Sequence, residues 1–245
     1  MKHPLYIVTP TGDRKEAFSY CIQYMERQTF RPDVWIITDD GTTDAVESLL
    51  PNIRINYDCI KLPRMEGNSL VRNLRSAFAV IPDDAYVCVI EDDDYYPKEY
   101  LDTMYTLLKT QDQVGARFHH YYNVAIRRFR VFRNSHTMCT HGLGFSRYGL
   151  SFFKNMINDT SVFCDGTQWG VDAHLGKVYD KPRGYNDTCL PVHIVGMPCG
   201  RPGTTVSHRL GPCPDPNRWK DDRNMRQLKE WVGGDYKNYE RFYIC

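Results

Sequence analysis

The sequence predicts an α/β fold in which a doubly wound, mostly parallel sheet is flanked by helices. Two observations favour this class. Over residues 5–110, short apolar runs rich in β-branched and aromatic residues alternate with amphipathic stretches of helical period. Three of these runs end in polar or acidic loops, and the carboxyl ends of parallel strands share one edge of a sheet. At 245 residues the chain can form one such domain or two smaller ones.

The elements of the first half follow in order. Its expected strands are apolar runs at residues 5–9, 34–38, 53–59 (the weakest) and 85–90. A helix is expected after the first strand, because Phe18, Ile22 and Met25 share one face and Asp13 can cap its start. Two more amphipathic helices are expected, at residues 68–80 and 97–109, the second with Pro97 in its first turn.

The regular alternation of strand and helix patterns ends near residue 113. The expected elements are two β segments within residues 114–132, separated near 122–123, helices at 145–156, 171–179 and 218–232, and a strand at 190–195. Residues 200–216 are dense in Gly and Pro and are expected to form a loop. The chain then ends in an aromatic tail, which we expect to pack onto the second half.

Composition excludes several classes of protein but does not identify a function. The net charge of +1 selects no partner, and an apolar content of 42% supports a sizeable core. The nine cysteines are an odd number without a C-x-x-C pair, which favours a reducing compartment over a disulfide framework or a zinc ribbon. Neither a signal peptide nor a bilayer-length apolar run is visible, so we expect a soluble cytoplasmic protein without a membrane partner.

Four consecutive acids, Glu91 to Asp94, directly follow the buried strand at 85–90. Carboxylates this close repel one another unless a cation or solvent offsets the repulsion. Oxygen ligands at the carboxyl end of a strand suit Mg²⁺ or Mn²⁺, usually shared with a phosphorylated substrate. The alternative is an acidic turn that is simply solvated.

Two other loops are expected at the same edge of the sheet. Residues 9–14 lead into a helix N-terminus and offer backbone N–H groups and Arg14 to an anion. Asp39 and Asp40 close the second strand and can accept hydrogen bonds from a base or a ribose. Together with the acids of residues 91–94, they predict a site for a nucleoside diphosphate.

These three strand ends resemble the GT-A-fold glycosyltransferases of the family-2 type, with a D-x-D metal motif. The resemblance implies three regions: a nucleotide-sugar-binding half at residues 1–112, an acceptor and catalytic half at 113–216, and a C-terminal helix and tail at 217–245. It implies Mn²⁺ or Mg²⁺ as cofactor and a nucleotide-diphosphate sugar, UDP favoured, as donor. Because four acids adjoin, the D-x-D register can shift by one residue.

The resemblance also implies roles for individual residues. The nucleotide-sugar contacts are Thr9, Pro10, Thr11, Gly12, Arg14, Asp39, Asp40, Asp92, Asp93 and Arg201. The metal ligands are Asp92, Asp94 and His208. The general base that takes the acceptor's proton is Asp172, which matches an acid-x-x-Leu element; Asp165 is the reserve candidate. The alternative for Asp172 is a structural role at a helix N-terminus.

Residues 114–158 contain no Asp or Glu but carry seven Lys and Arg residues with interleaved aromatics. Arginine and aromatic side chains suit a phosphate backbone and an extruded base. The expected contacts to such an acceptor are Arg127, Arg128, Arg130, Tyr121 and Tyr122. The alternative is that these arginines serve the donor diphosphate or pair with acids elsewhere.

Residues 5–14, 91–94 and 196–209 are similar to bacteriophage and TET-associated glycosyltransferases that modify hydroxymethylated pyrimidines in DNA. The resemblance implies an inverting glycosyltransferase with such a base as favoured acceptor, in the host cytoplasm if the gene is phage-encoded. Other hypotheses remain open. They are the same chemistry on a bacterial glycan or a small molecule, a nucleotidyltransferase, a metal nuclease, and a binding module without turnover.

Overall fold

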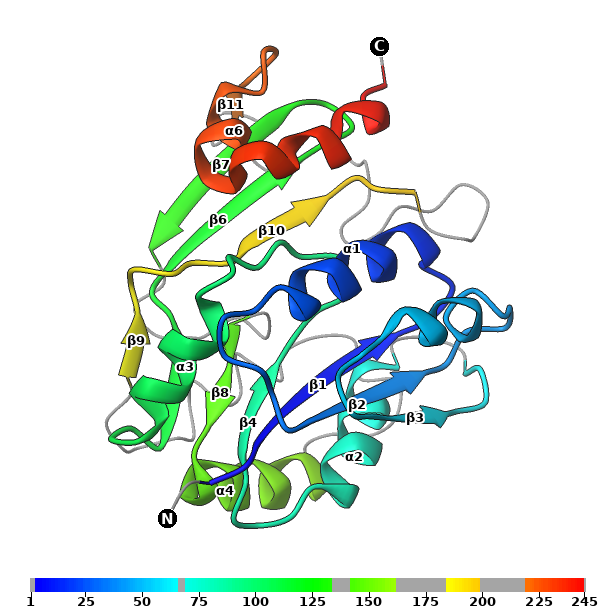
Figure 1. Cartoon of the computed structure of the whole chain (residues 1–245), viewed down its shortest axis with the longest axis vertical. Helices are drawn as coiled ribbons and strands as arrows, with labels where there is room; N and C mark the ends of the chain where they lie inside the picture. Colours follow the sequence, from blue (N-terminus) through cyan, green and yellow to red (C-terminus); the bar gives the residue numbers. More distant parts are fainter. Residues whose placement is uncertain (1–2, 66–68, 134–141, 162–183, 199–218, 245) are drawn as a thin grey trace.

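The chain folds around a seven-stranded sheet in a computed structural model that describes residues 3–65, 69–133, 142–161, 184–198 and 219–244 (Figure 1). Its strands are β1 (Leu5–Thr11), β2 (Val34–Asp39), β3 (Tyr57–Lys61), β4 (Tyr86–Val89), β5 (Gln113–Ala116), β8 (Gly144–Phe145) and β9 (Gly184–Asn186). The order is β3-β2-β1-β4-β8-β5-β9, and only β8 runs antiparallel to its neighbours. The predicted fold class is therefore confirmed.

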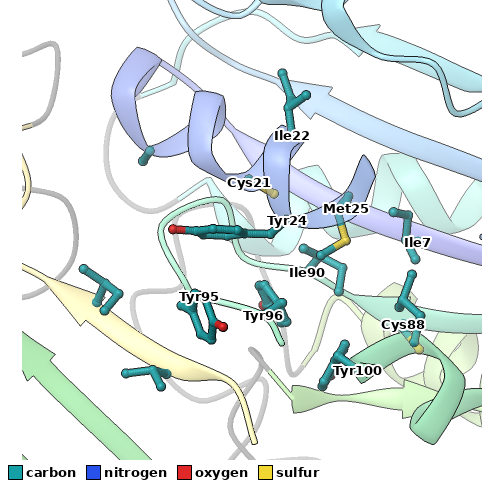
Figure 2. Packing of buried hydrophobic residues seen from close by; sticks show 14 of the residues in the cluster. Ile7, Cys21, Ile22, Tyr24, Met25, Cys88, Ile90, Tyr95, Tyr96 and Tyr100 are labelled. Carbon is teal, nitrogen blue, oxygen red and sulfur yellow. The ribbon is translucent and has the colours of Figure 1, made fainter. Parts of the chain in front are cut away.

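Helices cover both faces of this sheet because β1, β2 and β4 are apolar on both sides. The helices are α1 (Lys15–Glu26), α2 (Leu70–Val80), α3 (Tyr100–Leu108) and α4 (Arg147–Asn158), with a 3₁₀ turn η1 (Glu47–Asn52) after β2. α1 and α3 pack into one core cluster, in which Figure 2 shows Tyr24, Ile90 and Tyr100 among the buried residues. α2 and α4 build the other cluster, around Phe78 and Phe153.

A second, four-stranded sheet stands beside the first (Figure 1). Its order is β10 (Val192–Val195), β6 (Phe118–Asn123), β7 (Arg128–Arg133) and β11 (Lys220–Asp221). α6 (Arg226–Val232) lies against it, with Trp231 stacked on His120 at 4.4 Å between ring centroids. Two 3₁₀ turns, η4 (Gly233–Asn238) and η5 (Glu240–Phe242), complete the described tail.

Backbone pairing between Tyr95 and Val192 joins the second sheet to the acidic loop after β4. Each of these residues donates its N–H to the other's carbonyl, at 2.9 and 3.0 Å. β10 thereby runs past the carboxyl end of β4, although a hundred residues separate them in sequence. This contact brings the two sheets together at the candidate site.

Several predicted elements differ from the structure. Residues 114–132 fall in three strands, and their hairpin turn follows residue 123, with Arg127 at a positive φ of 49°. The last helix begins at Arg226 rather than 218, because residues 220–221 pair with β7 and the carboxylate of Asp222 accepts from the N–H groups of Gln227 and Leu228. The third strand lies at 57–61 rather than 53–59.

Two further expectations have different outcomes. Asp13 does not cap α1, because its carboxylate binds the loop after β2 instead. The helix predicted at 171–179 lies outside the described residues, and the three-region division stays a prediction. Among the described helices, none is long and apolar enough to cross a membrane.

Gly196 fixes the path of the chain as it leaves β10. It has a positive φ of 88°, and a Cβ there would lie 2.5 Å from Oδ1 of Asn123 and 3.1 Å from the N of Ala125. We expect Gly196→Ala to lower the free energy of unfolding by about 2 kcal/mol or more, through strain and overpacking. Gly234→Ala is the control, because a Cβ there meets nothing within 4 Å. Equal denaturation midpoints for the two variants would contradict this description of β10.

Candidate active site at the carboxyl edge of the sheet

The ends of β1 and β4 are cross-linked through Asp92. The hydroxyl of Thr11 donates to Oδ2 of Asp92 at 2.6 Å, and Nη1 of Arg14 lies 3.0 Å from Oδ1 of the same carboxylate. The same guanidinium nitrogen is 3.7 Å from Asp93. Asp92 is almost fully buried, and this burial raises its pKa despite the opposing effect of Arg14. Thr11 and Arg14 therefore connect the end of β1 to the acidic loop through the carboxylate of Asp92.

The ends of β1 and β2 are joined through Asp13. Its carboxylate accepts hydrogen bonds from the backbone N–H groups and the hydroxyls of Thr42 and Thr43, at 2.8–3.1 Å. Burial works to raise the pKa of Asp13, but these bonds outweigh it and leave the pKa lowered. Gly41 packs so closely that a Cβ would lie 2.9 Å from the carboxylates of Asp13 and Asp39.

Asp39 and Asp40 are buried and paired with cations of neighbouring segments. Asp39 accepts from the N–H of Gly41 at 2.8 Å and from Nζ of Lys61 at 2.6 Å. Asp40 lies 3.6 Å from a nitrogen of Arg64 and 3.5 Å from one of Arg72. Both acids at the end of β2 are thus paired with positive charges.

A second acidic group forms where β10 passes the loop. Nδ1 of His193 lies 2.7 Å from Oδ1 of Asp94 and 3.9 Å from a carboxylate oxygen of Glu91. The N–H of Ile194 also donates to Oδ1 of Asp94, at 3.2 Å, and the N–H of Glu91 donates to the hydroxyl of Tyr96. One ligand atom from each of Glu91, Asp94 and His193 lies within 4.8 Å of the others. We call these three residues the 91/94/193 cluster.

The electrostatics of the 91/94/193 cluster favour a positive charge, which the proton of His193 supplies without a metal and which a cation would supply in its place. Burial lowers the pKa of His193, but Asp94 and the acids beside it outweigh this effect, so the pKa of His193 is raised. Burial raises the pKa of Asp94, against the opposing effect of His193. Oδ2 of Asp94 is buried and accepts no hydrogen bond from the described part of the chain. Two carboxylates, an imidazole and this open lone pair fit a divalent cation.

Most residues of the predicted donor site meet at this edge. The residues that lie together are Thr11, Gly12, Arg14, Asp39, Asp40, Asp92 and Asp93, with Asp94 in the 91/94/193 cluster. Thr9 and Pro10 belong to β1 itself, where the hydroxyl of Thr9 accepts from the indole N–H of Trp35 and so serves the core. Asp165, Asp172, Arg201 and His208 lie outside the described residues.

The predicted acceptor residues lie on the second sheet and already have partners. Tyr122 is fully buried, which leaves no ring face for a base. Tyr121 packs edge-on against His193, with ring centroids 4.4 Å apart. The guanidinium carbon of Arg130 lies over the same tyrosine ring, 4.6 Å from its centroid. Arg128 pairs with Asp221 at 2.7 Å, and Arg127 donates to the carbonyl of Arg223. Pairing with acids elsewhere, the open alternative, is therefore observed for Arg128.

The sequence did not reveal two members of the 91/94/193 cluster. Glu91 belongs to the acidic run in which the D-x-D register can shift by one residue, and His193 lies in the strand predicted at residues 190–195. Neither residue is among the predicted metal ligands. A histidine inside an otherwise apolar run was the available signal, since a buried imidazole needs a polar partner. Its partner, Asp94, could not be identified from spacing alone.

The buried pair of Arg14 and Asp92 should make a measurable contribution to stability. Arg14→Met leaves Asp92 buried without its cation, and we expect a loss of about 1–3 kcal/mol, below the 3–5 typical of fully buried pairs because Arg14 is partly exposed. Adding Asp92→Asn should recover part of this loss. Lys98→Met is the control, since Lys98 and its partner Glu99 are both exposed. Additive effects of Arg14→Met and Asp92→Asn in urea unfolding would contradict the pairing.

Comparison with known proteins agrees with this geometry. Residues 6–174, more than half of the chain, match the model of Glycosyl transferase family 2. No curated protein sequence matches the chain. Residues 1–349 of TarS from S. aureus, in complex with UDP-GlcNAc, align with a TM-score of 0.58 and 14% identity, over 78% of this chain and 58% of that one.

The complex of the same TarS fragment with UDP gives a TM-score of 0.56 and 15% identity, over 79% of this chain and 61% of that one. The chain thus spans less than two thirds of these TarS fragments, and at this identity the likeness concerns the fold alone. The family match, the three strand ends and the acidic loop lead to one conclusion: the chain belongs to glycosyl transferase family 2.

Proposed function

We propose that the chain is a metal-dependent, inverting glycosyltransferase that moves a sugar from a nucleotide-diphosphate sugar to a hydroxyl group. The observation that carries this proposal is the meeting of three strand ends, rich in buried carboxylates, beside the 91/94/193 cluster. A divalent cation would offset the charge of these carboxylates and would at the same time bind an anionic diphosphate at this edge. The family assignment supports the reaction type.

The donor half of the site is assigned to the ends of β1 and β2. Asp39 and Asp40 would bind the nucleoside, with Gly12 close to Asp40. Thr11 and Arg14 contact the acidic loop, where the diphosphate would lie. We favour UDP, because TarS binds UDP-GlcNAc and UDP. The sequence provides Arg201 as a further diphosphate contact.

The 91/94/193 cluster is our proposed metal site. Asp92 is less suited than the sequence suggested, because its Oδ2 accepts a hydrogen bond from Thr11 and its Oδ1 lies 3.0 Å from Nη1 of Arg14. Like Oδ2 of Asp94, this Oδ1 accepts no hydrogen bond from the described part of the chain, so the ion pair with Arg14 is what distinguishes the two acids. The imidazole nitrogen in the donor set favours Mn²⁺ over Mg²⁺. When bound, such a cation neutralises charge on the departing diphosphate. His208 stays a predicted additional ligand.

Asp172 stays the proposed general base, within the range that matches the family. Its carboxylate would accept the proton of the acceptor hydroxyl while that oxygen bonds to the anomeric carbon and the bond from this carbon to the diphosphate breaks. Asp165 is the reserve candidate for the same role.

A 5-hydroxymethylated pyrimidine in DNA is the proposed acceptor. The acid-free segment 114–158 supports it. So does the pair of Tyr121, which lies against His193, and Arg130, whose guanidinium lies over the ring of Tyr121. The pairing of Arg128 and the burial of Tyr122 weigh against part of the predicted contact set. A glycan or a small hydroxylated molecule is the competing acceptor.

Variants of the 91/94/193 cluster test the metal site. We expect Asp94→Asn and His193→Gln each to lower the release of nucleoside diphosphate in Mn²⁺ on the order of 100-fold, because leaving-group charge is less well neutralised. Asp102→Asn, an exposed acid on α3, is the control and should keep the wild-type rate. Wild-type rates in both cluster variants would show that the metal is bound elsewhere.

The acceptor is tested with a panel of sugar nucleotides and paired DNA duplexes. Release of nucleoside diphosphate should require the duplex that carries hydroxymethylcytosine and should be absent with unmodified cytosine. Release without DNA would keep the transferase and exclude DNA as the required acceptor. Binding of a sugar nucleotide without any release would favour a module that lacks turnover.

The arginines of β7 and its turn are tested by the salt dependence of DNA binding. If Arg127, Arg128 and Arg130 contact phosphates, their joint replacement by Ala should weaken binding and reduce the salt slope by about one per lost contact. The control replaces Lys15 and Lys98, which are exposed cations of the first half. Equal salt slopes for the arginine variant and the wild type would contradict phosphate contact by these residues.

A further inference from the structure

The C-terminal turns are built into the fold through α1. Tyr239 is buried, and its hydroxyl forms a hydrogen bond of 2.7 Å with the hydroxyl of Tyr24. The hydroxyl of Tyr20 donates to the carbonyl of Asn238 at 2.9 Å. The hydroxyls of both tyrosines of α1 are therefore hydrogen-bonded to η4 or to the residue after it, so this segment packs against the helix.

An ion pair extends this contact. Nη1 of Arg27, just after α1, lies 2.6 Å from Oδ2 of Asp235 in η4. The guanidinium of Arg27 stacks over two rings, at 4.7 Å from the centroid of Tyr24 and 5.4 Å from that of Tyr95. Asp235 therefore fixes a cation that in turn covers the ring of Tyr95.

Tyr95 connects this aromatic group to the proposed metal ligands. Its ring meets Tyr24 edge-on, with centroids 5.0 Å apart, and Figure 2 shows Tyr24 projecting from α1 toward Tyr95 beside β10. In sequence Tyr95 follows Asp94 directly, and its backbone pairs with Val192, which directly precedes His193. Tyr95 thus connects the loop that carries Asp94 to the strand that carries His193.

We propose that Asp235 and Tyr239 are positioning residues for the 91/94/193 cluster, acting through Arg27, Tyr24 and Tyr95. The tail would keep the ring of Tyr95 in place, and with it the backbone bridge that sets the separation of Asp94 and His193. A loosened bridge lowers metal affinity because the ligands no longer hold one geometry. This inference rests on the proposed metal site.

The test measures Mn²⁺ affinity of the whole chain by the loss of the free-ion EPR signal, without any sugar nucleotide. Asp235→Asn and Tyr239→Phe should each weaken Mn²⁺ binding about 3- to 10-fold, below the 10- to 100-fold of residues that touch a ligand directly. The matched controls are Glu240→Gln and Tyr243→Phe, two exposed residues of the same tail, and they should bind as the wild type does.

Arg27→Met provides an independent readout. If Asp235 acts through Arg27, the variant that combines Asp235→Asn with Arg27→Met should bind Mn²⁺ no more weakly than Arg27→Met alone. Reduced thermal stability with unchanged Mn²⁺ affinity in Asp235→Asn and Tyr239→Phe would overturn the inference and leave the proposed function intact. If wild-type Mn²⁺ binding does not depend on Asp94, both the metal site and this inference fail.

Discussion

Five aspartates are buried together at one edge of the seven-stranded sheet, and the loops there are built around them. Asp39, Asp40, Asp92, Asp93 and Asp94 are all at most 4% exposed. An unpaired buried charge costs several kcal/mol, so each carboxylate needs a fixed partner. Arg14 is the partner of Asp92 and Asp93, and His193 is the partner of Asp94. At the end of β2, a lysine and two arginines are the partners of Asp39 and Asp40. The loops are ordered around these pairs.

The second sheet completes the site by a contact of long sequence range. β10 reaches the acidic loop through the bridge between Tyr95 and Val192, which brings His193 to Asp94. The same strand is held on its other side by β6, where Tyr121 lies against the imidazole. The contact that joins the two sheets therefore also pairs His193 with Asp94. The C-terminal turns reach this contact through α1.

The sequence was sufficient for the first half of the fold. Buried strands followed by acids, and helices with one apolar face, have local periods that can be read directly, so the meeting of the three strand ends at one edge could be predicted. The roles of individual residues at that edge came from the family resemblance and stay predictions. Contacts made across long separations could not be read in this way. Asp13 looked like a helix cap because its partners, Thr42 and Thr43, lie in another loop. Likewise, a count of arginines in residues 114–158 could not show that Arg128 pairs with Asp221.

The proposed cation ligands are Glu91, Asp94 and His193 rather than Asp92. An anomalous difference map at the manganese edge, from crystals grown with Mn²⁺ and UDP, would locate the ion. We expect one strong peak in contact with Asp94 and His193, while Arg14 still pairs with Asp92. A peak coordinated by Asp92, with Arg14 displaced from it, would show that Asp92 is the metal ligand.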